Sequence, residues 1–167
     1  MTAHDSSRRK GVNTMNKLFH LTKQGVDELQ AELEELTGQR SVIADRIKTA
    51  REFGDLGENM EYTAARQDQE RNESRITEIE HILSNVQVIT APKGDSAVVL
   101  GSSIKLKSVD GKTKEFQVVG TVEADPLNGK ISDESPIGKA LMGKREGDEV
   151  EIKTPAETVT YKIVDIS

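Results

Sequence analysis

Three acidic residues, Asp55, Glu58 and Glu61, lie close together in the N-terminal half of the chain, beside Gly54 and Gly57. Side chains three residues apart on a helix share one face, so we expect Asp55 and Glu58 to converge on one point. Two converging carboxylates suit a hard cation such as Mg²⁺, which takes only one or two protein carboxylates and keeps several waters. Two carboxylates cannot form a closed metal site by themselves. Inserted into a site on another protein, they could supply its missing ligands.

The same spacing also has a structural interpretation. Asp55 followed three residues later by Glu58 fits a capping box at the start of a helix. Acidic side chains near a helix N-terminus are in addition favoured by the helix dipole. The capping box is the commoner device, and the two roles are compatible on spacing alone.

Two heptad patterns flank the acidic residues and must position them. The first comprises Val26, Leu29, Leu33, Leu36, Arg40, Ile43, Ile47 and Ala50, and the second Tyr62, Ala65, Gln69, Asn72, Ile76, Ile79, Leu83 and Val86. The residue numbers of facing positions always add to 112, as they must in an antiparallel hairpin centred on residue 56. With Thr22 as a helix cap, about 33 residues at a rise of 1.5 Å place the tip roughly 50 Å from the base. Arg40, opposite Asn72 in the pattern, is interpreted as a register device.

The amino-acid composition limits the classes of function that the chain can have. The 167 residues carry a net charge of −6 and only 3% are aromatic, whereas free-standing nucleic-acid binders usually present a basic face or stacking rings. Residues 22–88 hold 8 Lys/Arg against 15 Asp/Glu, a net of −7, so any nucleic acid nearby is expected to be held by another protein. The absence of cysteine excludes disulfides and thiolate chemistry. No apolar run approaches the ~18 residues of a membrane span, so we expect a soluble protein without a membrane partner. The lack of cysteine fits a cytoplasmic location, and a hairpin formed within one chain fits a monomer.

Other side chains give weaker signals. Arg51 and Arg66 flank the tip, and Arg71 and Arg75 follow. They suit phosphate contacts, but pairing with nearby acids on a solvated helix face is the simpler interpretation for Arg71 and Arg75. The three histidines are too scattered for a ligand set, and no catalytic triad, phosphate loop or zinc spacing is present.

The chain divides into four parts. We expect residues 1–14 to be a disordered leader or an artificial extension, and residues 15–90 to form the hairpin, with its tip at 53–59. Residues 91–96 have linker composition, and residues 97–167 form a second domain.

Short alternating runs predict an antiparallel sheet in the second domain. The runs are Val98–Leu100, Ile104–Lys107, Phe116–Val119, Val150–Lys153 and Val159–Ile163. One short helix is expected, with Ser135 as N-cap, Pro136 in the first turn and Gly143 as its stop. The fold class is therefore α+β.

Two long motifs resemble a known family. Residues 50–66 read AREFGDLGENMEYTAAR, which resembles the tip signature of the bacterial Gre transcript-cleavage factors, the GreA branch in particular. Residues 131–143 read ISDESPIGKALMG and, with Gly147 and Asp148 after them, resemble the C-terminal motif of the family. The opening of the first helix, residues 21–25, is also similar. The resemblance runs from about Met15 to Ser167.

The resemblance implies a transcription elongation factor whose partners are bacterial RNA polymerase and the backtracked 3′ end of the nascent RNA. Family members insert the hairpin into the secondary channel of the polymerase, which then cleaves the RNA by two-metal hydrolysis. By position, Asp55 and Glu58 match the acidic pair that helps to hold Mg²⁺ shared with the polymerase active site, with no cofactor bound stably. Arg51 and Arg66 match basic positions that contact RNA or the channel.

The resemblance also implies an FKBP-like second domain that docks at the channel rim. The docking residues carried over by position are Ser135, Pro136, Ile137 and Gly138. The chain departs from the family at Met60, where alanine is more usual. Few basic residues lie on the second helix, which favours the GreA-like branch and short cleavage products.

Three alternative functions remain. A prolyl-isomerase-like chaperone needs an aromatic pocket, yet the second domain offers only Phe116 and Tyr161. A coiled-coil adaptor accounts for the heptads but not for the acidic tip combined with the C-terminal motif. An anti-cleavage inhibitor of the same channel is disfavoured by the presence of both Asp55 and Glu58.

Overall fold

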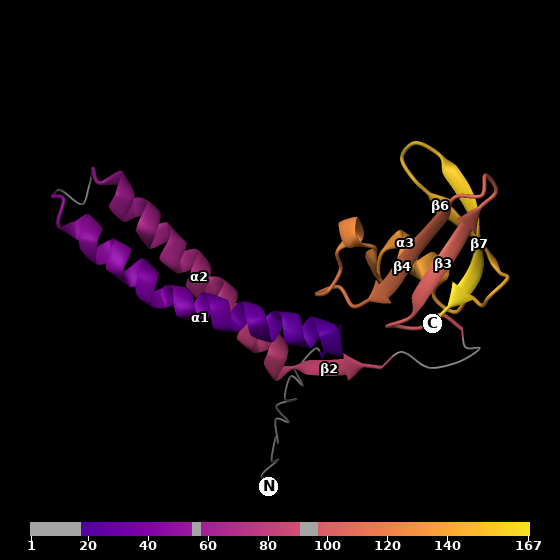
Figure 1. The fold of residues 1–167 in the computed structure, drawn as a ribbon, viewed down its shortest axis with the longest axis horizontal. Helices are drawn as coiled ribbons and strands as arrows, with labels where there is room; N and C mark the ends of the chain where they lie inside the picture. The colour runs from indigo at the N-terminus through magenta and orange to yellow at the C-terminus, as the bar shows by residue number, and fades with distance from the viewer. Residues whose placement is uncertain (1–17, 55–57, 91–96) are drawn as a thin grey trace, which may run out of the picture.

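The computed structural model describes residues 18–54, 58–90 and 97–167. Two long antiparallel helices are followed by a five-stranded sheet that carries one short helix (Figure 1). This confirms the predicted α+β fold of a helical hairpin joined to a small β domain. The expected leader at 1–14 and linker at 91–96 lie outside the described residues. No described helix is long and apolar enough to cross a membrane.

The hairpin consists of helix α1 (Lys23–Arg51) and helix α2 (Met60–Ser84). The 29 residues of α1 span about 43 Å at 1.5 Å per residue. Thr22 is its N-cap, as predicted, because its hydroxyl oxygen accepts a hydrogen bond from the Gly25 N–H at 3.1 Å. Among the described residues, every buried position of the two helices falls on the predicted heptad patterns except Gly25 and Ile82.

A two-stranded parallel sheet closes the base of the hairpin. Strand β1 (Phe19–Thr22) precedes α1 and strand β2 (Val86–Ile89) follows α2, with Phe19 opposite Val86. The sequence patterns did not predict this sheet, because runs of four residues are too short to show a period of two. Val86, expected in the helical seam, lies in β2, and α2 ends two residues before it.

The core of the hairpin is divided by a polar layer. The buried residues of the basal cluster are Leu21, Leu29, Ile79 and Ile82, and those of the tip cluster are Ile43, Ile47 and Ala65. Between them Asn72 is 6% exposed, and its Nδ2 donates to the Leu36 carbonyl at 3.0 Å. Its Oδ1 is buried without a partner among the described residues. Arg40 lies outside the core and forms two hydrogen bonds of 2.8 Å to Glu73 across the hairpin.

The β domain is a mixed sheet in the order β5-β4-β3-β7-β6. Its strands are β3 (Ser103–Ser108), β4 (Thr113–Val119), β5 (Lys130–Ser132), β6 (Glu149–Lys153) and β7 (Thr158–Ile166). The prediction of a wholly antiparallel sheet is wrong for β5, which pairs in parallel with β4. The chain crosses over between these two strands through the 3₁₀ turn η1 (Pro126–Asn128), so β5 enters the sheet edge in the same direction as β4.

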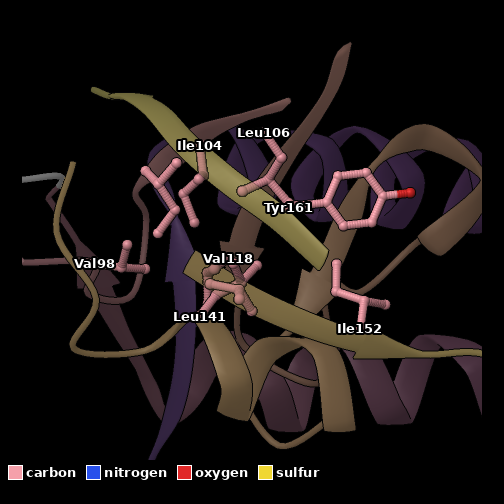
Figure 2. Close-up of a cluster of buried hydrophobic side chains, with 9 residues drawn as sticks. Val98, Ile104, Leu106, Val118, Leu141, Ile152 and Tyr161 are labelled. Carbon is pink, nitrogen blue, oxygen red and sulfur yellow. The ribbon is translucent and has the colours of Figure 1, made fainter. Parts of the chain in front are cut away.

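One apolar core holds the β domain together. Burial alternates along β3, so one face of the sheet is covered, and helix α3 (Pro136–Leu141) contacts β5 and β6. Figure 2 shows the packed side chains, including Val98, Ile104, Leu106, Val118, Leu141, Ile152 and Tyr161. The strand predicted at residues 98–100 is irregular instead. Its apolar residues still serve the core, since Val98 is buried and its N–H donates to the Lys144 carbonyl at 2.8 Å.

We expect Asn72→Leu to stabilise the protein. The change removes a buried oxygen that lacks a described partner, and a buried unsatisfied group costs about 1–3 kcal/mol. The free energy of unfolding, measured by urea titration, should rise by about 1 kcal/mol. Ser74→Leu, at an exposed position of the same helix, is the control and should change it by less than about 0.5 kcal/mol. A loss of stability in Asn72→Leu would contradict this account of the polar layer.

Candidate functional site at the hairpin tip

The ends of the two helices form the tip. Helix α1 finishes at Arg51, and the Phe53 N–H donates to the Ala50 carbonyl at 3.2 Å. Gly54 has a φ of 115°, a conformation that glycine adopts without steric cost. Ala50 and Ala65 are fully buried between the helices. Their small side chains allow the two helices to approach closely just below the tip.

Asn59 joins the two helix ends. Its Oδ1 accepts a hydrogen bond from the Tyr62 N–H at 3.0 Å, and its Nδ2 donates to the Ala50 carbonyl at 2.6 Å. Asn59 is therefore the N-cap of α2, and it also satisfies a carbonyl of the last turn of α1.

This finding corrects the predicted capping box. Helix α2 begins at Met60, so Glu58 lies in the turn before the helix rather than in its first turn. Asparagine caps a helix as well as aspartate does, and here it makes a second bond that a carboxylate cannot donate. The sequence carried a usable signal, since Asn59 stands three residues before the seam residue Tyr62.

The acidic residues of the tip differ in their surroundings. Glu58 is exposed and forms no hydrogen bond or ion pair with any residue that the structure describes. Glu61 forms an ion pair with Arg46 at 3.1 Å. Asp55 lies outside the described residues. Because Glu58 precedes the first residue of α2, the argument from helical spacing does not apply to it. The convergence of Asp55 and Glu58 stays a prediction.

The two basic residues expected at the tip are both exposed. The guanidinium of Arg51 lies 5.8 Å from the centroid of the Tyr62 ring, within the range of a cation–π contact. Arg66 donates to the Gln69 side chain at 2.7 Å. Both cations are thus held at the surface near the end of the hairpin.

Arg71 and Arg75 are both paired with acidic side chains, and only Arg75 reaches the facing helix. Arg71 pairs with Asp68 at 3.1 Å, and Arg75 pairs with Glu32 of the facing helix at 2.7 Å and with Glu78 at 2.9 Å. The hydrogen bond from Arg75 holds the pKa of Glu32 below its usual range. These contacts agree with the simpler interpretation of Arg71 and Arg75 as partners of nearby acids.

Two apolar side chains at the tip were not identified from the sequence. Phe53 is 79% exposed and Met60 is 86% exposed. They lie five residues before and two residues after Glu58, and neither belongs to the helical seam. Both apolar side chains are thus open to solvent within a few residues of the Glu58 carboxylate.

The segment predicted to dock on a partner is the N-terminus of α3. Ser135 is its N-cap: its hydroxyl accepts from the Gly138 N–H at 3.0 Å and donates to the Ser132 carbonyl at 2.6 Å. A Cβ on Gly138 would lie 1.9 Å from that carbonyl oxygen, so only glycine fits. Pro136 is exposed, and Ile137 packs against the core of the β domain. The segment is therefore a fixed turn with one face open to solvent.

The tip has the chemistry of a ligand donor. Within residues 18–54, 58–90 and 97–167, no group of three or more His, Cys, Asp or Glu could hold a metal ion. An exposed carboxylate such as that of Glu58 is nonetheless a suitable oxygen ligand for a hard cation, which needs only one or two from a protein.

Comparison with known proteins places these features in a family. A sequence model of the N-terminal domain of transcription elongation factors matches residues 19–88, and one of the C-terminal domain of GreA/GreB transcription elongation factors matches residues 92–167. The chain belongs to the GreA/GreB family of transcription elongation factors. The two matched regions correspond to the helical hairpin and the β domain.

Individual GreA/GreB relatives agree over nearly the whole chain. The transcription elongation factor GreA of Bacillus velezensis is 42% identical over 153 residues, which are 90% of this chain and 98% of that protein. GreA of Listeria welshimeri is 44% identical over 154 residues, covering 90% and 96%. The crystal structure of GreA factor homolog 1 from Thermus thermophilus is 32% identical, covers 90% of this chain and 99% of that one, and has a TM-score of 0.42.

Because Asn59 is the observed cap, substitutions of Asn59 and of Glu58 should change the stability of the protein by different amounts. Asn59→Ala removes the cap, which should lower the free energy of unfolding by about 1 kcal/mol, and loses a second bond worth about 1 kcal/mol. Glu58→Gln should leave it within about 0.5 kcal/mol, since this side chain bonds no described residue. Urea titration of both variants checks the difference. Equal destabilisation by Asn59→Ala and Glu58→Gln would indicate that the acidic pair, rather than Asn59, caps the helix.

Proposed function

We propose that this chain inserts its hairpin into the secondary channel of bacterial RNA polymerase and stimulates the polymerase to cleave the 3′ end of backtracked RNA. Its membership of the GreA/GreB family implies RNA polymerase as a partner. One observation carries the rest of the proposal: Glu58 is exposed at the free end of a hairpin whose first helix has 29 residues.

The dimensions of the hairpin support insertion. Helix α1 is about 43 Å long, and two packed helices of about 10 Å diameter form a rod about 20 Å wide. The β domain lies at the opposite end from the tip (Figure 1). A narrow rod of this length delivers its end deep into a channel while the wider domain stays at the entrance.

The tip residues contribute ligands and positive charge. Glu58, together with Asp55, lends carboxylate oxygens to a Mg²⁺ ion shared with the polymerase active site. When bound there, the metal supplies Lewis acidity and an activated water for hydrolysis of the phosphodiester bond. Arg51, placed over the Tyr62 ring, and Arg66 offer guanidinium groups to the RNA phosphates or to the channel wall. The polymerase performs the reaction, so the chain is not itself an enzyme.

Docking is assigned to the other half of the molecule. The segment Ser135–Gly138 is held by two hydrogen bonds and a glycine contact, and Pro136 is exposed on it. A preformed turn loses little conformational freedom on binding. Docking at the channel rim through this segment leaves the hairpin to supply the chemistry inside.

The tip carboxylates can be tested on backtracked polymerase complexes. Asp55→Asn and Glu58→Gln should each lower stimulated RNA cleavage by about a hundredfold, the size typical of losing one contact to developing charge. Both variants should still compete with the parent for polymerase, and raised Mg²⁺ should restore part of the rate by mass action. Glu70→Gln, at an exposed position farther along α2, is the matched control and should cleave like the parent.

Two results of this assay would contradict the proposal. If Asp55→Asn and Glu58→Gln both cleave like the parent, the carboxylates have no role in the reaction. If the parent protein slows cleavage, the chain is an inhibitor of the same channel.

The docking segment makes a different prediction. Pro136→Ala should raise the concentration of factor needed for half-maximal cleavage by about fivefold, the equivalent of a contact worth about 1 kcal/mol. The maximal rate should stay unchanged, because the tip is intact. Leu127→Ala, at an exposed position of η1 outside the segment, is the control. A fall in the maximal rate at unchanged half-saturation would show that Pro136 does not dock.

A further inference from the structure

A buried carboxylate lies where the hairpin meets the β domain. The side chain of Glu123, between β4 and η1, is 4% exposed. Its Oε2 accepts a hydrogen bond from the Thr22 N–H at 2.9 Å, and its Oε1 accepts one from the Thr22 hydroxyl at 2.6 Å. The Nζ of Lys130 lies 3.3 Å from Oε1 and neutralises the buried charge. Thr22 and Glu123 are 101 residues apart in the sequence.

These contacts place Glu123 in the cap of the longest helix. The hydroxyl of Thr22 accepts from the Gly25 N–H and donates to Glu123, so hydrogen bonds run from the first turn of α1 into the β domain. A carboxylate at the N-terminus of a helix is also favoured by the helix dipole. The β domain therefore completes the N-terminus of the helix that carries the tip.

Two glycines, one from each half, make the close approach possible. A Cβ on Gly25 would lie 2.6 Å from Cδ of Glu123, and a Cβ on Gly120 would lie 2.2 Å from the carbonyl oxygen of His20. Neither glycine has a positive φ, so both are needed for space rather than for backbone conformation. The junction therefore combines a hydrogen-bonded ion pair with a close steric fit.

We propose that Glu123 is a positioning residue that fixes the angle between the hairpin and the β domain, and that this angle sets where the tip lies when the domain is docked. The second part rests on the proposed function. A rotation of about 5° at the junction moves a tip about 43 Å away by about 4 Å. A displacement of about 1 Å at a reacting centre can cost about a hundredfold in rate.

The fixed angle can be measured without polymerase. The chain has no cysteine, so Gln67→Cys and Lys153→Cys, both at exposed positions, give one spin label on α2 and one on β6. The distance distribution between the labels should be narrow in this background. It should broaden or shift in Glu123→Ala, which removes the carboxylate, and in Gly120→Ala, which introduces a clash between the halves.

Gly38→Ala is the matched control for the glycine variant. An added Cβ there has no heavy atom within 4 Å, and Gly38 has an ordinary helical conformation. Its distribution should equal that of the parent. Circular dichroism is used to check that each variant is folded. If Glu123→Ala does not fold, Glu123→Gln is measured in its place. Unchanged distributions in both folded junction variants would overturn the proposal.

Cleavage assays separate positioning from docking. In Glu123→Ala and Gly120→Ala the maximal stimulated rate should fall by about tenfold or more, while the half-saturating concentration stays at the parental value. General damage to the β domain would instead raise that concentration and would count against a positioning role. Changed distances with a parental cleavage rate would overturn the link to the tip. If the parent itself does not stimulate cleavage, the proposed function fails, and the distance measurements still decide whether Glu123 fixes the angle.

Discussion

The side-chain amide of Asn59 closes the hairpin, and the position of the tip depends on this closure. It caps α2 through the Tyr62 N–H and binds the Ala50 carbonyl of α1. The amide both accepts and donates here, whereas a carboxylate can only accept. Because the cap is at Asn59, Glu58 stays outside the helix, with no described partner in the hairpin. The closure that stabilises the two helix ends thus leaves the Glu58 carboxylate exposed in the turn before α2.

Between the base and the tip, the apolar core of the hairpin is small and is interrupted by polar side chains. The tip cluster has three buried residues, and the polar layer around Asn72 separates it from the basal cluster. Ion pairs cross the hairpin on its surface, where Arg40 binds Glu73 and Arg46 binds Asp68. Hydrogen bonds from these arginines lower the pKa of both carboxyls, so both remain ionised. Exposed pairs add little stability each, but a one-residue shift of the helices would break all of them.

The hairpin could be predicted from the sequence because its signal is long and periodic. Eight layers of facing positions leave few alternatives, and the buried residues follow them almost throughout. Features that depend on a single residue or a short run were missed. The start of α2 is set by Asn59, which competed with an equally plausible cap at Asp55, and β5 has three residues. The junction at Glu123 joins residues 101 positions apart, and no local pattern marks an acidic residue as the distant partner of a helix cap.

The two halves of the molecule have different physical requirements, and the structure meets them in different places. At the base, α1 begins against a two-stranded sheet, the basal cluster and the buried carboxylate of Glu123. At the other end of the hairpin, the described residues Phe53 and Met60 are exposed to solvent. A long lever of this kind is useful only if its angle is fixed at the base, because any rotation there is multiplied by the length of α1. A rotation at the junction therefore displaces the tip residues more than a comparable local movement at the tip.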